Sequence, residues 1–403
     1  MVSTHAAASA SEIASRIEAH LGALADRAPR RPPGSAANRA ATQYVEGVLR
    51  AAGVPTEALP FTAHSWQPGA AWLELDGRAI PIEPPPFCGS ATVRGPAVPL
   101  AAPGELNAFA AGPGAVILLR DELAVAPYFP KAFPFVSFPE QVEVIAALEA
   151  VAPAAVLAVV DAARAGEPTF EDPDLAFPYA TIPASLGDSI APGAEVGLRV
   201  EASIEEGEGV NLSGGTLTGR RAIVCAHVDS KATTPGLLDN GGGVAVLLAL
   251  AESGFAELGP TELVFFNGED HYAAPGEQTW LAARDLAEIE LVVNIDGAGL
   301  AGHRAAASTL AGSSALEERV AQIVARCPGL EIGPPWFESD HAVFAMRGIP
   351  TVAITSAGDV EVLKRLAHAA DETLARVDPR VLADVARFVQ LLLGQPARAT
   401  RSA

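Results

Sequence analysis

The stretch that most constrains the fold is Ala222–Leu250, A-I-V-C-A-H-V-D-S-K-A-T-T-P-G-L-L-D-N-G-G-G-V-A-V-L-L-A-L. It begins as an apolar, β-branched run, which is typical of a strand that is buried on both faces. The run ends at His227, Asp229 follows, and a Pro-Gly turn leads towards a second apolar run that is long enough for a helix. Asp239 or Asn240 is the expected N-cap of that helix. Taken alone, the stretch is explained equally well by a capping Asp and a surface His.

Two further stretches repeat this construction. The apolar run Glu262–Asn267 is followed by Glu269 and Asp270, and the run Leu291–Ile295 is followed by Asp296. The carboxyl ends of parallel strands share one edge of a sheet, where open α/β sheets bind their ligands. Several carboxylates at one point repel each other unless a cation neutralises them. The sequence therefore predicts a metal site, and His with Asp and Glu suits Zn²⁺ or, less well, Mn²⁺ or Co²⁺.

The order of six motifs resembles one enzyme family. The motifs are H-V-D, L-L-D-N-G-G-G, G-E-D, N-I-D, S-D-H-A-V-F-A-M-R-G-I-P and H-A-A-D-E-T, between Ala222 and Val377. Together they resemble the di-zinc exopeptidases related to aminopeptidase Y and glutamate carboxypeptidase II. Glutaminyl cyclases and the catalytically inert transferrin receptor share that fold. Nearer the N-terminus, R-R-P-P-G-S-A-A-N-R-A-A-T-Q-Y-V resembles the entry helices of the same family.

The resemblance implies two zinc ions per chain and a role for each matching residue. The implied metal ligands are His227 and Asp296 for one zinc, Asp270 and His368 for the other, and Asp239 as the bridge. The implied catalytic residues are Glu269, the general base, and Asp229, which supports His227 or a nearby backbone group.

Three further residues are candidates for substrate binding, namely Asp340, His341 and Tyr272. His341 also competes with His368 as a ligand, because it lies in a loop beside an acid, but the histidine of S-D-H is not a ligand in the family. Some relatives carry a Tyr directly before the last His, where this chain has Ala367. The metals alone could suffice, Tyr272 could supply the missing donor, or activity could be low.

Composition narrows the class of protein. A chain of 403 residues with 49% hydrophobic residues can bury a large core in two or three domains. The net charge of −21 argues against nucleic acid and anionic membrane surfaces as partners. Three widely spaced cysteines predict no disulfide framework and favour the cytoplasm. We also expect no secretion signal and no membrane-spanning segment.

The pattern along the chain predicts an interrupted catalytic domain. Residues 1–70 and 205–403 are its expected parts, and residues 71–204 form an inserted β-rich domain that resembles a protease-associated domain. An extension of the main sheet is the alternative for this insertion. Helices are predicted over 11–26, 36–52, 138–150, 314–327 and 379–393. The aromatic stretch Ala126–Pro139 is a candidate contact surface or a packed loop.

The predicted fold is therefore α/β, with a mostly parallel central sheet flanked by helices and an inserted β-rich domain. The predicted function is that of a metal-dependent exopeptidase acting on peptides, with an aminopeptidase favoured over a carboxypeptidase. The other two hypotheses are a single-zinc, glutaminyl-cyclase-like acyltransferase and a non-catalytic binding protein on the same scaffold.

Overall fold

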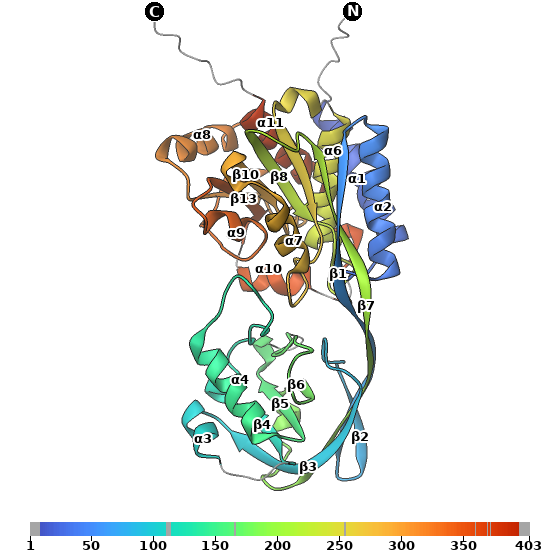
Figure 1. Ribbon diagram of the computed structural model, residues 1–403, viewed down its shortest axis with the longest axis vertical. Coiled ribbons are helices and arrows are strands. Elements are labelled where there is room, and N and C mark those ends of the chain that lie inside the picture. Colours follow the sequence, from blue (N-terminus) through green and yellow to red (C-terminus); the bar gives the residue numbers. More distant parts are fainter. Residues whose placement is uncertain are drawn as a thin grey trace, which may run out of the picture. The chain divides into compact units, whose positions relative to one another are not determined.

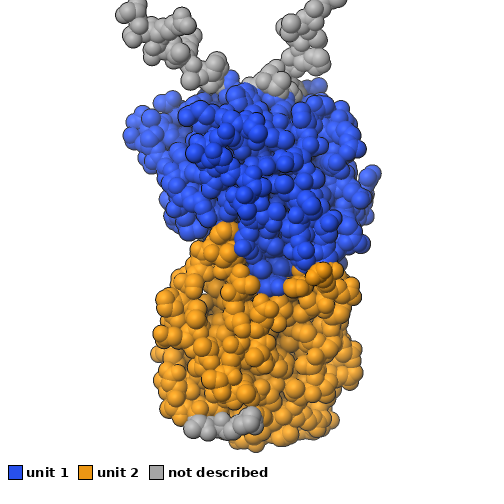
Figure 2. Space-filling model, in the orientation of Figure 1, with its two compact units in different colours: residues 1–63, 207–403 blue, residues 64–206 orange. Residues whose placement is uncertain are grey.

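The computed structural model describes residues 9–109, 114–164, 167–253, 255–358, 360–368, 370 and 372–394. The chain divides into two compact units, one of residues 1–63 and 207–403 and one of residues 64–206 (Figure 2). Two long strands, β1 (Thr56–Leu75) and β7 (Glu195–Gly215), have residues in both units. Each unit has its own hydrophobic core.

The sheet of the first unit is built around four parallel strands (Figure 1). These are β8 (Arg221–His227), β9 (Thr261–Phe266), β10 (Ile289–Ile295) and β13 (Thr351–Ser356). The strand order is β12-β11-β13-β10-β8-β9-β7. Strand β11 (Ala305–Leu310) is antiparallel to β13 and parallel to β12 (Leu330–Ile332), and the end of β7 is antiparallel to β9. The predicted α/β class with a mostly parallel sheet is confirmed.

Helices cover both faces of this sheet. One face carries α1 (Ala10–Arg27), α2 (Ala36–Ala51), α6 (Gly242–Glu252) and α11 (Pro379–Leu393), which pack around one core. The other carries α7 (Pro275–Ala283) and α9 (His341–Ala345), where Phe266, Trp280 and Phe344 pack ring against ring. The remaining helical elements are α8 (Ser314–Val324), α10 (Val360–Ala367), η3 (Leu237–Gly241), η4 (Phe255–Leu258), η5 (Leu286–Glu288) and η6 (Leu374–Arg376).

Helix α6 lies at the centre of the first core. Every residue from Gly242 to Ala251 is buried, which explains why this segment is apolar on all sides. The surface helices α1 and α2 are amphipathic and begin at capping serines. Ser9 and Glu12 form a capping box, and the Ser35 side chain accepts a hydrogen bond from the Asn38 N–H. The helices predicted near the two ends of the chain are therefore confirmed, with boundaries shifted by a residue or two.

The second unit has a mixed set of strands, in which β3, β4, β5 and β6 are parallel while β7 is antiparallel to β3. Its strands run in the order β7-β3-β4-β5-β6, and β2 (Arg78–Ile82) pairs with the later part of β1. The other bounds are β3 (Ala91–Leu100), α3 (Pro103–Ala108), β4 (Val116–Leu119), η1 (Asp121–Leu123), α4 (Pro139–Val151), β5 (Ala155–Val160), η2 (Ala162–Arg164), β6 (Tyr179–Pro183) and α5 (Ala184–Gly187). Strands β4 and β5 are buried on both faces. Whether this unit is a protease-associated domain stays a prediction.

Among the residues that the structure describes, every helix is too short or too polar to cross a lipid bilayer.

Candidate metal centre

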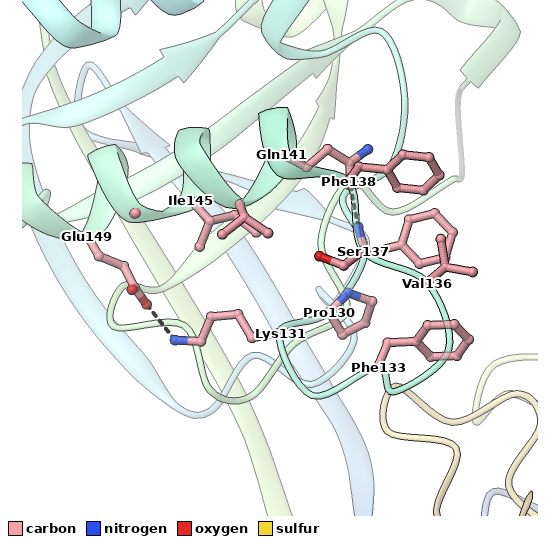
Figure 3. A pocket seen from close by; sticks show the side chains of 12 residues that line it. Pro130, Lys131, Phe133, Val136, Ser137, Phe138, Gln141, Ile145 and Glu149 are labelled. Atoms are coloured by element: carbon pink, nitrogen blue, oxygen red, sulfur yellow. Dashed lines mark hydrogen bonds and ion pairs between the residues drawn. The ribbon is translucent and has the colours of Figure 1, made fainter.

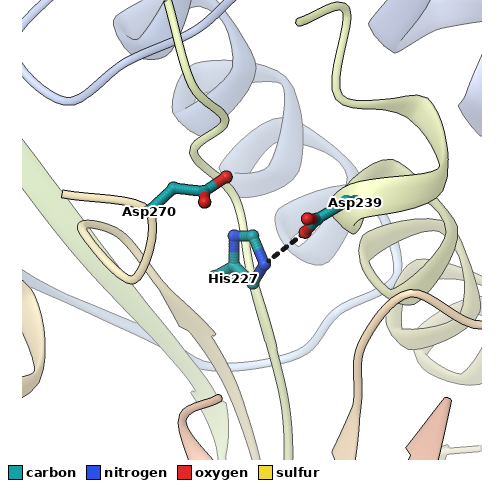
Figure 4. A group of neighbouring side chains, drawn as sticks. All are labelled: His227, Asp239 and Asp270. Carbon is teal, nitrogen blue, oxygen red and sulfur yellow. Dashed lines mark ion pairs between the residues drawn. The ribbon is translucent and has the colours of Figure 1, made fainter. Parts of the chain in front are cut away.

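Three strand ends bring acid and imidazole groups to one place. His227 is the last residue of β8, Asp270 lies in the turn after β9, and Asp296 directly follows β10. In a parallel sheet these ends share one edge, and the side chains meet there. The Nε2 atom of His227 lies 3.3 Å from an Asp296 oxygen, and ligand atoms of His227, Asp239 and Asp270 all lie within 4.8 Å of one another (Figure 4).

Asp239 lies between two histidines. One of its carboxylate oxygens is 2.9 Å from His227 Nε2, and the other is 3.0 Å from His368 Nε2. His368 Nε2 is also 3.8 Å from an Asp270 oxygen. The sequence predicted Asp239 or Asn240 as the N-cap of α6, but the N-cap residue is Gly241, so both predicted positions are wrong. The Asn240 side chain instead accepts the Gly243 N–H at 3.0 Å, so the Asp239 carboxylate faces the imidazoles.

The donor set fits a bound cation. His227 is fully buried, yet neither ring nitrogen makes a hydrogen bond to any described residue, although carboxylate oxygens surround Nε2. Burial alone would lower the pKa of His227, but the carboxylates, Asp296 foremost, raise it well above its usual value. Burial and the charge of Asp239 raise the pKa of Asp270 to about 6. A divalent ion would replace the protons that this concentration of negative charge otherwise attracts.

Asp229 supports the turn that carries Glu269 and Asp270. Its two carboxylate oxygens accept the N–H groups of Gly268 at 2.7 Å and Asp270 at 3.1 Å. Its distance to His227 Nδ1 is 3.6 Å, which is too long for a hydrogen bond. Of the two supporting roles expected for Asp229, the structure therefore displays the contact with backbone groups.

Glu269 has the position and environment of a proton carrier. Its side chain is 22% exposed, and Oε2 lies 3.9 Å from His227 Nε2. Burial, together with the charges of Asp296 and Asp270, raises the pKa of Glu269 well above its usual value, although His227 opposes this. A carboxyl group whose pKa is raised by its surroundings can accept a proton and release it again.

The structure separates the two candidate histidines. His368 contacts the carboxylates, and its side chain is 37% exposed. His341 is fully buried, with Nδ1 3.1 Å from the Asn294 amide nitrogen and Nε2 2.8 Å from the Trp336 carbonyl oxygen. Both of its ring nitrogens are therefore engaged within the protein. The predicted substrate contact through His341 would require one of these contacts to break.

The remaining predicted pocket residues are also largely buried. Tyr272 is 7% exposed and lies beside the His271 ring, with ring centres 4.4 Å apart. Asp340 is 1% exposed, and no N–H or hydroxyl group of the described residues donates to its oxygens. Its direct contact with substrate stays a prediction, as does that of Tyr272.

Asp340 has an acidic neighbour that the sequence did not indicate. Glu277, near the start of α7, is 3% exposed and within hydrogen-bonding reach of Asp340. Burial and the charge of Asp229 raise the pKa of Glu277 to about 7. Burial and the charge of Glu277 raise that of Asp340 well above its usual value. Two carboxyl groups this close share one proton, because both cannot stay ionised together.

Two further residues were missed, Arg31 and Glu372. Both are buried, and both bind the backbone of the loop that leads to Asp239. Each lies inside a motif that carries the family resemblance, R-R-P-P-G-S and H-A-A-D-E-T. Asp371 of the second motif lies outside the described residues.

The second unit contains a pocket of its own, lined by the stretch that the sequence marked as a contact surface (Figure 3). Its apolar wall includes Phe129, Phe133, Phe138 and Ile145. At one end Lys131 Nζ lies 2.7 Å from a Glu149 oxygen, so the charged groups of the pocket neutralise each other.

Comparison with known proteins finds similarity to peptidases. Residues 210–393 match the sequence profile of Peptidase family M28. Among curated proteins, 82 residues are 35% identical to a vacuolar membrane protease of Clavispora lusitaniae; they represent 20% of this chain and 8% of that protein. The chain therefore corresponds to only a small part of that relative.

Solved structures with the same fold cover nearly the whole chain. An aminopeptidase from Aneurinibacillus sp. strain AM-1 is 19% identical, with a TM-score of 0.74 over 94% of this chain and 92% of that one. BSAP, a zinc aminopeptidase from Bacillus subtilis, is 18% identical, with a TM-score of 0.71 over 94% of each chain. A peptidase M28 precursor from Shewanella amazonensis SB2B is 15% identical, with a TM-score of 0.68 over 95% of each. At these identities the likeness establishes a shared fold.

Proposed function

We propose that the chain is a di-zinc aminopeptidase with Glu269 as its general base, on the premise that residues 210–393 match Peptidase family M28. The family supports a metal-dependent peptidase. The number of zinc ions, the base and the preference for a free amino terminus are our proposal.

The observation that carries the proposal is the position of Asp239 between two imidazoles. Its two oxygens lie 2.9 Å from His227 and 3.0 Å from His368, which suits a carboxylate that bridges two ions. Each histidine has a further acid beside it, Asp296 for His227 and Asp270 for His368. These five residues would hold two zinc ions, and the donor set of nitrogen and oxygen atoms suits zinc.

Bound zinc would lower the pKa of a water molecule to about 7 and polarise the scissile carbonyl. Glu269 would take the proton of the attacking water and deliver it to the leaving amine. Asp229 holds the N–H groups on either side of Glu269, which keeps the base at a fixed distance from the ligands. His227 and Glu269 lie on one side of the cluster, 3.9 Å apart, so the base lies within reach of the reacting water.

The charge around the centre favours a substrate with a free amino terminus. Besides the proposed ligands, Glu269 and Asp340 add acidic groups near the centre, and a protonated amine is recognised by acidic groups. A cation is also present, because Lys231 Nζ lies 3.9 Å from Asp270. A carboxypeptidase would use such a group to bind a substrate carboxylate, so the choice of substrate end has to be measured. The cytoplasmic location suggested by the cysteine content also stays a prediction.

The test combines metal content with a substrate panel. Protein loaded with zinc and freed of excess should contain two zinc ions per chain, measured by elemental analysis. It should hydrolyse aminoacyl amides and fail on the same substrates with a blocked amino terminus. One zinc per chain with cyclisation of N-terminal glutamine would favour the glutaminyl-cyclase-like alternative. No bound divalent metal would refute the proposal.

A further inference from the structure

A loop of residues 228–238, here called the presenting loop, connects the strand that ends at His227 to Asp239. None of the residues in this loop is a proposed metal ligand. The path of this loop nevertheless determines where the Asp239 carboxylate lies relative to the two histidines. Whatever fixes the loop therefore controls the bridging position.

Arg31 fixes the loop from one side. Its side chain is fully buried and donates to three main-chain carbonyl oxygens, those of Val228, Pro235 (3.1 Å) and Gly236 (2.6 Å). The main-chain N–H of Arg31 donates to Ser230 Oγ at 3.1 Å. The loop is thus tied at both its beginning and its end to a residue from the N-terminal segment.

The packing around this contact leaves no room for a side chain at Gly236. Gly236 has a φ of +70°, and a Cβ there would approach the Ser230 Cβ to 2.4 Å and an Arg31 nitrogen to 3.0 Å. The Gly241 N–H donates back to the Gly236 carbonyl oxygen at 3.0 Å. The loop therefore closes on itself around the guanidinium, with a glycine where the left-handed backbone requires one.

Glu372 fixes the loop from the other side. Its carboxylate accepts the N–H groups of Leu237, at 2.9 Å, and of Leu238, which directly precedes Asp239. Glu372 lies in the same short segment as His368. The segment that carries one proposed zinc ligand is thus hydrogen-bonded to the segment that carries the bridging ligand, independently of any metal.

The charges of the two residues fit this arrangement. The hydrogen bonds of Arg31 go to neutral carbonyl oxygens, so its charge is balanced at longer range by Asp229, Glu372, Asp239 and Asp270. A buried cation without such carboxylates would be strongly destabilising. Arg31 therefore contributes both a rigid three-point attachment and a positive charge beside the acidic ligands.

We propose that Arg31 and Glu372 are positioning residues that hold the Asp239 carboxylate between the two histidines, and that Glu372 in particular sets the affinity of the zinc held by Asp270 and His368. This inference rests on the proposed di-zinc centre. It assigns a function to the R-R-P-P-G-S motif and to the end of H-A-A-D-E-T. Outer residues that orient metal ligands typically change metal affinity by about 10–100-fold when they are replaced.

Arg31 and Glu372 are together called the clamp. The experiment compares metal binding in two clamp variants and two matched controls. Glu372→Gln keeps the shape of the side chain but can accept only one of the two N–H groups. Arg31→Lys keeps the charge but cannot reach three carbonyl oxygens. Asp384→Asn is the control for the first variant, because Asp384 also accepts a loop N–H, that of Gly329 at 2.7 Å, away from the centre. Arg221→Lys is the control for the second, because Arg221 is equally buried, at the opposite end of β8 from His227.

Zinc binding is measured on the full-length chain by competition with a chromophoric chelator, without substrate, beside unfolding in urea. We expect Glu372→Gln to weaken the second zinc by about 10–100-fold while the first stays bound, and Arg31→Lys to weaken both. Both controls should bind zinc like the wild type, even where Arg221→Lys lowers the stability of the fold.

The outcomes separate this inference from the proposed function. If the wild type binds two zinc ions and folded Glu372→Gln binds both with unchanged affinity, the positioning role is refuted and the clamp only stabilises the fold. If Arg31→Lys does not fold, the zinc affinity of Glu372→Gln alone tests the positioning role. If the wild type itself binds no zinc, the proposed function has failed, independently of the clamp.

Discussion

The carboxyl pair of Glu277 and Asp340 should make the stability of the metal-free protein depend on pH, and Glu277→Gln should remove the part of that dependence that is linked to Glu277. The pKa of Glu277 is raised from 4.5 to about 7 by burial and by the charge of Asp229. Between these two pH values the folded chain holds a proton that the unfolded chain has lost. The stability linked to this proton is fully present below pH 4.5 and is lost as the pH rises through about 7.

The size of the effect follows from the shift. One pKa unit corresponds to about 1.4 kcal/mol, so ionisation of Glu277 lowers the free energy of unfolding by up to about 3 kcal/mol. A glutamine at this position needs no shared proton, because its amide can donate to the Asp340 carboxylate at any pH. The variant should therefore gain stability over the wild type as the pH rises.

The assay is unfolding in urea, in the presence of a chelator, at about pH 5 and about pH 8. From about pH 5 to about pH 8, the free energy of unfolding of Glu277→Gln should rise relative to that of the wild type by up to about 3 kcal/mol. Glu318→Gln, at an exposed position of α8, is the control and should show no such change. An equal difference at both pH values would refute the shared proton.

Three further predictions concern the metal centre. Glu269→Gln should keep its zinc and lower kcat at least about 100-fold, because general-base catalysis contributes about 10²–10⁴-fold; a near-normal kcat in steady-state assays would mean that another group accepts the proton. His368→Ala should lose one zinc per chain in elemental analysis, whereas His341→Ala should keep both, and the reverse pattern would exchange their roles. Zinc affinity should fall as the pH drops through about 6, the pKa of Asp270, because proton and metal compete for the carboxylate. Chelator competition at stepped pH measures this, and a flat profile would exclude Asp270 as a ligand.

The parts of the fold that depend on local pattern could be predicted from the sequence. The run before His227 and the run before Asp296 are strands because they are apolar and β-branched, and parallel strands align their ends. The convergence of the acids at one edge follows from that topology. Local pattern left Asp239 ambiguous, since an Asp before a helix is a good cap as well as a ligand. Only the structure decides, because the Asn240 side chain, and not that of Asp239, accepts the Gly243 N–H.

The residues that the sequence did not reveal act over long separations. Arg31 lies some 200 positions before the loop that it binds, and its side chain bonds to backbone atoms, which leave no trace in residue identity. Glu277 lies in the first turn of α7, and Asp340 directly precedes α9. The two residues are neighbours only because α7 packs against α9. Periodicity and spacing cannot report such pairs.

The clamp on the presenting loop also sets an order of events during synthesis. Arg31 precedes unit 2 in the chain, the loop follows unit 2, and Glu372 is made later still. At about 5–20 residues per second, Glu372 follows Arg31 from the ribosome by roughly 20–70 s. In the last part of that interval His227 and Asp239 have been made but Glu372 has not, so the loop is attached on one side only. If the proposed centre binds zinc, high-affinity binding would be postponed until Glu372 has been made, and a chain that stops short of Glu372 would carry ligands without a rigid bridge between them.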